Sequence, residues 1–142
     1  MVVVGPLVNL LVRVCTMNKV INVGVAAKLG KYSDAIQTNS GARWLYTSGT
    51  PGLNEDGTLP ADFESQARLA WKSIVAMLHA ADMDVENIVK INQSMLRRED
   101  LQVYRTIRDE YLGHARPASM LSFISELVMP GMLIELEIVA AK

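Results

Sequence analysis

The sequence predicts an α+β domain in which two amphipathic helices cover one face of a β-sheet. Apolar residues recur at steps of three and four along residues 62–81 and 100–112, which is the spacing of an amphipathic helix. The other apolar runs are short and are bounded by Gly, Pro, Asn or Asp, as is typical of strands. In chain order the pattern is strand, hairpin, helix, strand, helix and two strands, which favours an α+β sandwich with its helices on one side of the sheet.

Length and composition indicate one globular domain. The chain has 142 residues, of which 50% are hydrophobic and 20% charged, so one core can form. The formal net charge is −1 and the pI is about 6.1, which predicts no basic surface for nucleic acid. The single cysteine, Cys15, excludes an internal disulfide and a cysteine cluster for a metal. We therefore expect a protein of the reducing cytoplasm.

The first 16 residues are strongly apolar but do not predict a membrane segment. They lack the basic start of a signal peptide, and Gly5-Pro6, Asn9 and Arg13 interrupt the apolar run. Met17 stands where the first strand should begin. We expect residues 1–16 to be an extension that precedes the natural start, and residues 17–142 to form a single domain without a membrane partner.

The beginning of this domain reads as short strands joined by turns. Residues 19–23 form a candidate strand, and residues 24–30 a loop. Residues 33–38 and 43–48 flank the turn-forming tetrad Asn39-Ser40-Gly41-Ala42, and this pattern predicts a β-hairpin. 

A long loop follows this hairpin. Gly49 ends the strand directly after Ser48, and residues 50–60 are rich in Gly, Pro, Asn and Asp. A loop that leaves a strand in this way is a natural border for a pocket.

The two helices have recognisable ends, and a strand with a polar face lies between them. Asp62 stands at a helix N-cap position, and Gly113 is suited to the end of the second helix. Residues 88–96 alternate as in a strand, with polar residues on one of its faces. These polar residues are Lys90, Asn92 and Ser94. Such a face indicates contact with water or with another subunit.

Two strands end the chain, and the second one carries carboxylates. A turn at Met129–Gly131 separates a run that ends at Phe123 from a run over residues 133–139. Because side chains alternate along a strand, Glu135 and Glu137 share one face while their apolar neighbours share the other. From the residues alone, either carboxylate could be functional or simply exposed.

Several motifs together resemble the RidA/YjgF family of small trimeric enamine/imine deaminases, which also carries the label endoribonuclease L-PSP. The resemblance extends from about Lys31 to the C-terminus, with the motifs in the family's order. They are Lys31-Tyr32-Ser33-Asp34-Ala35, Thr47-Ser48-Gly49, Arg116-Pro117-Ala118-Ser119, Leu127-Val128-Met129-Pro130-Gly131 and Ile134-Glu135-Leu136-Glu137.

This resemblance implies a fold, an assembly and a reaction. The fold would be a chorismate-mutase-like sandwich, assembled as a homotrimer with a pocket at each subunit interface. Glu135 would be the catalytic residue that positions the water attacking an imine carbon. Tyr32, Ser48 and the backbone of Gly49 would contact the substrate. The reaction would be that of a 2-iminobutanoate/2-iminopropanoate deaminase, and it would need no cofactor.

One position departs from the family pattern. Ser119 stands where family deaminases have the arginine that grips the substrate carboxylate, and Leu121 stands where they have a small pocket-lining residue. Charge-assisted hydrogen bonds contribute about 1.5 to 3 kcal/mol each. Losing two of them should weaken binding of an amino-acid-derived imine by about a hundredfold or more. Arg116 is three residues away on an extended run, which places it on the opposite face.

Three functions therefore stay open. The first is a deaminase whose substrate range is altered by Ser119, and the second is a non-catalytic trimer that binds a small ligand. The third, a ribonuclease, is disfavoured because the chain lacks a basic surface. His79 and His114 have no ligand partners at metal-binding spacing, so no metal site is predicted.

Overall fold

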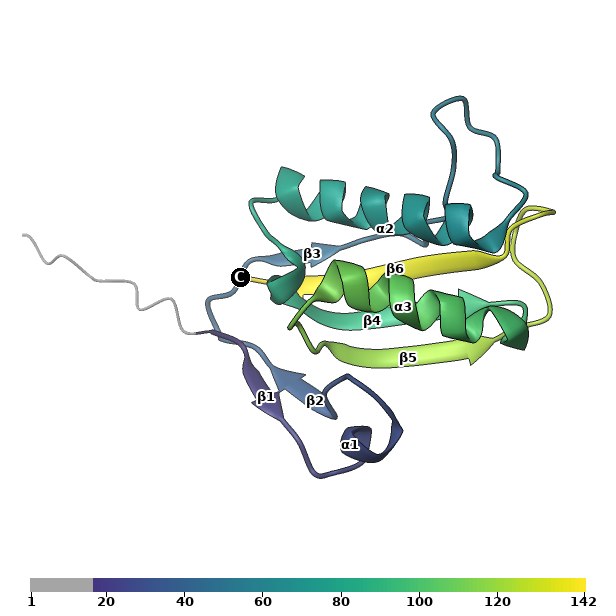
Figure 1. The fold of residues 1–142 in the computed structure, drawn as a ribbon. Coiled ribbons are helices and arrows are strands. Elements are labelled where there is room, and N and C mark those ends of the chain that lie inside the picture. The colour runs from purple at the N-terminus through teal and green to yellow at the C-terminus, as the bar shows by residue number, and fades with distance from the viewer. Residues whose placement is uncertain (1–16) are drawn as a thin grey trace, which may run out of the picture.

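Two helices lie against one face of a four-stranded mixed sheet (Figure 1). The computed structural model describes residues 17–142, and the expected extension at residues 1–16 lies outside the described residues. The elements in chain order are β1 (Lys19–Ile21), α1 (Ala26–Leu29), β2 (Ala35–Gln37), β3 (Trp44–Tyr46), α2 (Phe63–Ala80), β4 (Ile88–Met95), α3 (Leu101–Leu112), β5 (Ala118–Phe123) and β6 (Ile134–Ala141). The predicted α+β class, with both long helices on one side of the sheet, is confirmed.

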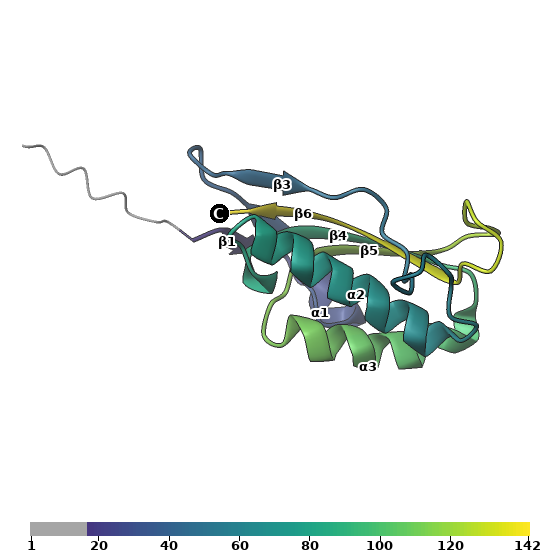
Figure 2. The same cartoon turned by 90° about the horizontal axis from the view of Figure 1, so that it is seen from above.

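The sheet has the strand order β3-β6-β4-β5. The pair β4–β5 is parallel, whereas β6 runs antiparallel to both β3 and β4. Figure 2 shows that α2 and α3 lie on the same side of this sheet, so no helix of residues 17–142 covers its other face. That uncovered face is called the open face below.

Helix α2 forms where the periodicity predicts it. The carboxylate of Asp62 accepts a hydrogen bond from the backbone N–H of Ser65 at 2.8 Å, which caps the first turn. One stripe of the helix is buried against the sheet and α3, and it consists of Phe63, Ala67, Ala70, Trp71, Ile74 and Leu78.

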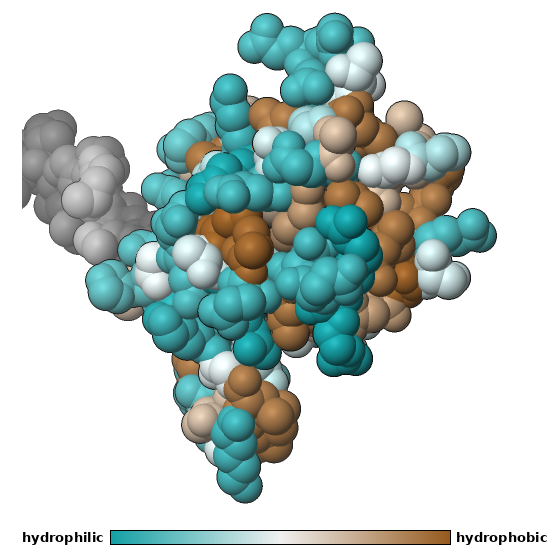
Figure 3. Space-filling model, turned by 45° about the vertical axis from the view of Figure 1, so that its right-hand side comes forward, coloured by the Kyte–Doolittle hydropathy of each residue, from teal (hydrophilic) through white to brown (hydrophobic). Residues whose placement is uncertain are grey.

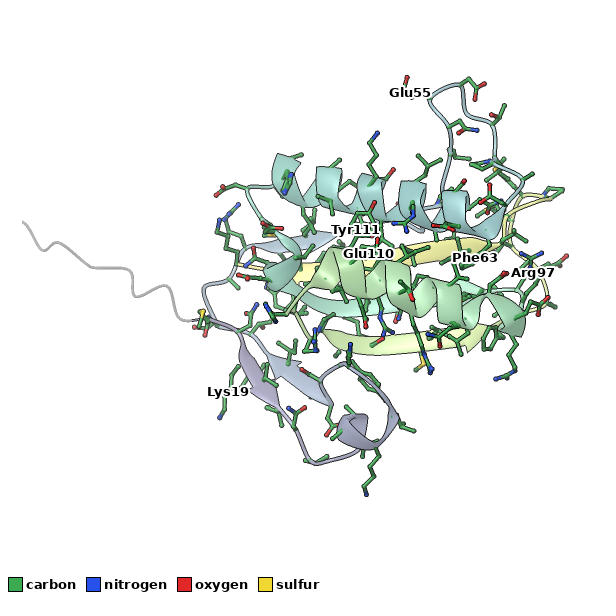
Figure 4. All side chains as sticks on the ribbon, in the orientation of Figure 1. Lys19, Glu55, Phe63, Arg97, Glu110 and Tyr111 are labelled. Carbon is green, nitrogen blue, oxygen red and sulfur yellow. The ribbon has the colours of Figure 1, made fainter. Side chains whose placement is uncertain are left out.

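Helix α3 is held beside α2 by a ring contact and an ion pair. The rings of Trp71 and Tyr111 stack with centroids 5.6 Å apart. Arg68 on α2 reaches Glu110 on α3 with 2.6 Å between guanidinium nitrogen and carboxylate oxygen. Figure 4 labels Glu110 and Tyr111 on the side of α3 toward α2. Because α3 is fixed in this way, its opposite side is oriented toward β5.

The buried side chain of Gln66 joins α2 to both neighbouring loops. Its amide nitrogen donates hydrogen bonds to the carbonyl oxygens of Pro60 and Gly131, both at 2.8 Å, and its amide oxygen accepts one from the N–H of Leu133 at 2.8 Å. A Cβ atom at Gly52 would lie 1.8 Å from the backbone oxygen of Gln66. The loop before α2 therefore packs directly on the helix backbone, and only glycine allows this approach.

The central strands β4 and β6 have one apolar and one polar face, as their alternation predicts. Their apolar residues, including Ile91, Met95 and Leu136, are fully buried under the helices. On the open face Ser94 pairs in register with Glu135, and Asn92 with Glu137.

The predicted hairpin of residues 33–38 and 43–48 is wrong. Strand β2 pairs with β1, and β3 pairs with β6 instead. Backbone hydrogen bonds in both directions between Arg43 and Lys142 extend the β3–β6 ladder. The loop predicted at residues 24–30 also contains the short helix α1. Figure 1 shows the β1–β2 pair next to the β5 side of the sheet, away from β3.

A single carboxylate organises the β1–α1–β2 unit. Asp34 accepts hydrogen bonds from the backbone N–H groups of Val23, Gly24, Val25 and Ala26, at 2.5 to 3.3 Å. These bonds, with that from Ala26 the strongest, hold the pKa of Asp34 below its usual value. The unit is attached to the sheet where Ser33 forms a parallel bridge with Ala118 of β5.

Candidate functional site

A cavity of about 610 Å³ lies between α3, β5 and the segment that follows α1. Three of the residues singled out from the sequence line it: Tyr32, Ser119 and Leu121. They come together because alternation along β5 turns residues 119 and 121 toward the helix side of the sheet, in register with the buried Ile91 and Gln93 of β4. The bridge between Ser33 and β5 brings the neighbouring Tyr32 to the same place.

A buried hydrogen-bond chain ends at the hydroxyl of Ser119. The hydroxyl of Tyr104 donates to the amide oxygen of Gln93 at 2.7 Å. The amide nitrogen of Gln93 donates to the Oγ of Ser119 at 2.8 Å and to the carbonyl of Met120 at 3.0 Å. Burial raises the pKa of Tyr104 far above its usual range, so its hydroxyl stays a neutral donor.

These hydrogen bonds determine whether the Ser119 hydroxyl can donate to a ligand or accept from it. Gln93 presents its oxygen to Tyr104, so its nitrogen must face Ser119. The Oγ of Ser119 therefore serves as an acceptor toward Gln93, and its own proton is left for another partner. Gln93 is 1% exposed and Tyr104 is 0% exposed. Ser119 is consequently a hydrogen-bond donor oriented by the protein core.

Positive charge exceeds negative charge in the cavity wall. Lys31, Arg105 and Arg108 line it, and among the described residues Asp109 is its one carboxylate. The two oxygens of Asp109 bind Lys31 and Arg108, each at 3.1 Å. Partial burial raises the pKa of Asp109, but the hydrogen bonds from Lys31 and Arg108 outweigh it and hold the pKa below the usual value. The carboxylate therefore stays ionised and neutralises only one of three cations.

Glu135 belongs to a second group of candidate residues, on the open face. It is half-buried, and it lies so close to Gly49 that a Cβ atom there would be 2.6 Å from the Glu135 carboxyl carbon and Oε1. Thr50 and Leu136 exchange backbone hydrogen bonds at 2.7 and 3.0 Å, which fixes the segment of Ser48 and Gly49 against β6. Ser48, Gly49 and Glu135 thus form one cluster.

The two groups of candidate residues lie on opposite sides of the sheet. Ser48, Gly49 and Glu135 do not line the cavity that contains Tyr32 and Ser119. Within one chain a small substrate cannot touch both groups.

Arg116 does not reach the cavity, as its position on the run predicts. Its guanidinium donates to the carbonyl oxygens of Gly113 and Ala115, at 2.8 and 2.7 Å, and so closes the end of α3. Arg105 and the Tyr104–Gln93 chain are site features that sequence reasoning missed. The polar residues Gln102, Arg105 and Asp109, spaced along one side of α3, were the available signal.

Nothing in the described part of the chain resembles a metal centre or a membrane span. Among residues 17–142, no group of three or more His, Cys, Asp or Glu side chains is placed to hold a metal ion. No helix among them is long and apolar enough to cross a bilayer.

Comparison with known proteins gives one consistent family. The sequence profile of the family described as "Endoribonuclease L-PSP" matches residues 24–142. A RutC family protein of Aquifex aeolicus is 31% identical over 117 residues, which cover 80% of this chain and 90% of that protein. The 2-iminobutanoate/2-iminopropanoate deaminase of Mus musculus is 29% identical over 118 residues, covering 82% and 84%.

A solved structure supports the same fold. A Rid-family protein of Yersinia pestis, described as being of unknown function, superposes with a TM-score of 0.78 at 22% identity. The match covers 89% of this chain and 100% of that one.

Proposed function

Because this chain belongs to the endoribonuclease L-PSP family, the family of the RidA/YjgF proteins, we propose that it is an enamine/imine deaminase. Its substrate is a small reactive imine, which it hydrolyses to a carbonyl compound and ammonia. The observation that carries this proposal is the cluster of Ser48, Gly49 and Glu135. It holds a half-buried carboxylate against a glycine on the open face of the sheet.

Glu135 acts as the general base in this reaction. Its carboxylate accepts a proton from a water molecule, and the water oxygen forms a bond to the imine carbon. That proton passes to the imine nitrogen, which gives a neutral carbinolamine. Glu135 then transfers the hydroxyl proton of the carbinolamine to the nitrogen, the C–N bond breaks as the C=O bond forms, and ammonia departs. Positioned proton transfer of this kind contributes about 10²- to 10⁴-fold in rate.

The active enzyme is a homotrimer in which neighbouring chains complete each other's sites. The two groups of candidate residues lie on opposite sides of the sheet, so a complete site needs Tyr32, Ser119 and Leu121 from one chain and the Glu135 cluster from its neighbour. The character of the open face supports burial against another copy. Trp44 is 47% exposed and Tyr46 is 70% exposed, more than a tyrosine or tryptophan usually is.

Ser119 changes the substrate range of this deaminase. A neutral hydroxyl replaces a guanidinium on β5, so a carboxylate bound at residue 119 loses its charged partner. Leu121 is half-buried beside it and adds apolar surface.

The test is ammonia release from enzymatically generated 2-aminoacrylate and from 2-iminobutanoate. Glu135→Gln should lower kcat by about a hundredfold or more, since it removes the base. Glu137→Gln is the matched control, because Glu137 lies two residues further along the same face and is exposed. Sedimentation of both variants checks that they assemble as the wild type does. Equal activity of Glu135→Gln and wild type would overturn the proposed mechanism, and a monomeric active enzyme would overturn the shared site.

A further inference from the structure

The wall of the cavity between α3 and β5 contains a cation that has no partner among residues 17–142. Among the described residues, Arg105 forms no hydrogen bond or ion pair, and its side chain is exposed at the cavity. Lys31 and Arg108 also line the cavity, but both are bound to Asp109. Asp109 lies one helical turn after Arg105, but each of its oxygens already binds another cation. It therefore attracts the Arg105 guanidinium only weakly.

We propose that this cavity binds the anionic group of a small ligand, a carboxylate, through Arg105, with the Ser119 hydroxyl as a second donor. The proposal rests on the deaminase function proposed above, because it names how the substrate's carboxylate is held. Strand β5 has Ser119 where family deaminases have an arginine, and Arg105 on α3 supplies the positive charge from the other side of the same cavity.

The burial pattern of α3 explains why Arg105 lies at the cavity. Tyr104 and Ile107 are buried toward the core, with exposures of 0% and 1%. The positions between and beside them, including Gln102 and Arg105, therefore lie on the side that lines the cavity. The buried side chains of Tyr104 and Ile107 and the ring stack of Trp71 on Tyr111 hold this helix against the sheet and α2.

Two kinds of donor then meet an anion from different directions. Arg105 offers a planar guanidinium that matches the two oxygens of a carboxylate. The Ser119 hydroxyl accepts a hydrogen bond from Gln93, so its own proton is free to be donated to the ligand. Arg108, of which 11% of the side chain is exposed, contributes through its charge rather than through direct contact. A neutral ligand of the same shape would lose the guanidinium contact.

Binding of a stable carboxylate separates this proposal from catalysis. The probe is 2-oxobutanoate, and its neutral counterpart is 2-oxobutanamide; both are titrated into the assembled protein by calorimetry. We expect Arg105→Gln to weaken 2-oxobutanoate binding by about tenfold to a hundredfold, the range for a net loss of one charge-assisted hydrogen bond. Binding of 2-oxobutanamide should be the same in wild type and variant. Ser119→Ala should weaken the carboxylate by a smaller factor.

Lys72→Gln on α2 is the matched control, because it removes the same charge from an exposed position away from the cavity. It should leave carboxylate binding unchanged. Equal affinities of Arg105→Gln and Lys72→Gln for 2-oxobutanoate would overturn the proposal, even if the protein is a deaminase. Conversely, Arg105-dependent binding in a protein without turnover would uphold the anion site and overturn the proposed reaction instead.

Discussion

Replacing Gly49 by alanine tests whether the position of the Glu135 carboxylate matters for catalysis rather than for stability. A Cβ atom at residue 49 would lie 2.6 Å from both the carboxyl carbon and Oε1 of Glu135, and 3.1 Å from Oε2. Carbon atoms in contact are normally about 3.5 to 4.0 Å apart. The carboxylate must therefore move by about 1 Å in Gly49→Ala.

The cost of this movement should appear in activity rather than in stability. The atoms that clash are the far end of a flexible side chain on the open face, so a changed rotamer relieves the overlap for about 1 kcal/mol. A catalytic group displaced by about 1 Å, however, can lose about a hundredfold in rate. We expect kcat for ammonia release to fall by about that factor, while the midpoint of urea unfolding moves little.

Gly41→Ala is the matched control for this experiment. A Cβ atom at Gly41 would have no heavy atom within 4 Å, and Gly41 does not have a positive φ. The control should keep both activity and stability. If Gly49→Ala released ammonia as fast as Gly41→Ala, the close approach of Gly49 to Glu135 would not matter for catalysis, and the role given to Glu135 would be refuted.

Three further predictions concern stability. Gly52→Ala should destabilise the fold by more than about 3 kcal/mol in urea unfolding, because its Cβ would overlap a backbone oxygen of Gln66 and no side-chain rotation can relieve this; a loss below 1 kcal/mol would contradict that packing. Gln93→Leu should cost about 2 to 4 kcal/mol, since it leaves the buried Tyr104 hydroxyl and the half-buried Ser119 hydroxyl without their hydrogen bonds; the same unfolding curves test it. The pKa of Asp34 is lowered in the folded chain, so its contribution to stability is present above about pH 4 and is lost as the pH falls through the lower folded value. Asp34→Asn should abolish this acid dependence in hydrogen exchange at the amides of residues 23–26, and unchanged exchange would count against it.

Those parts of the fold that local patterns decide were predictable. Helix α2 begins and ends within one residue of the predicted range, because Asp62 caps it and its apolar stripe repeats without interruption. The strands β4 and β6 were likewise predictable from alternation. In each case the side chains that determine the element lie within the element itself.

Strand pairing was predicted less well because the partner is distant in sequence. The turn after residue 38 forms, with a hydrogen bond from the N–H of Ala42 to the carbonyl of Asn39. The strands beside it nevertheless pair elsewhere, since β6 pairs with β3 and the Asp34 carboxylate draws the β1–β2 unit together. The turn-forming residues alone predict neither the β3–β6 pairing nor the hydrogen bonds to Asp34.

The candidate site shows the same division between what is local and what is not. Family motifs identified Tyr32, Ser119 and Glu135 by position, but they could not indicate that Ser119 is joined to the core. Serine can accept the hydrogen bond from Gln93, whereas arginine has no acceptor atom. An arginine at residue 119 would therefore leave one buried N–H of Gln93 unpaired, so residues 93 and 119 form a matched pair. If serine at residue 119 is part of this buried chain, the charge for an anionic ligand has to come from another element, and Arg105 on α3 is the unpaired cation that the described chain offers at the same cavity.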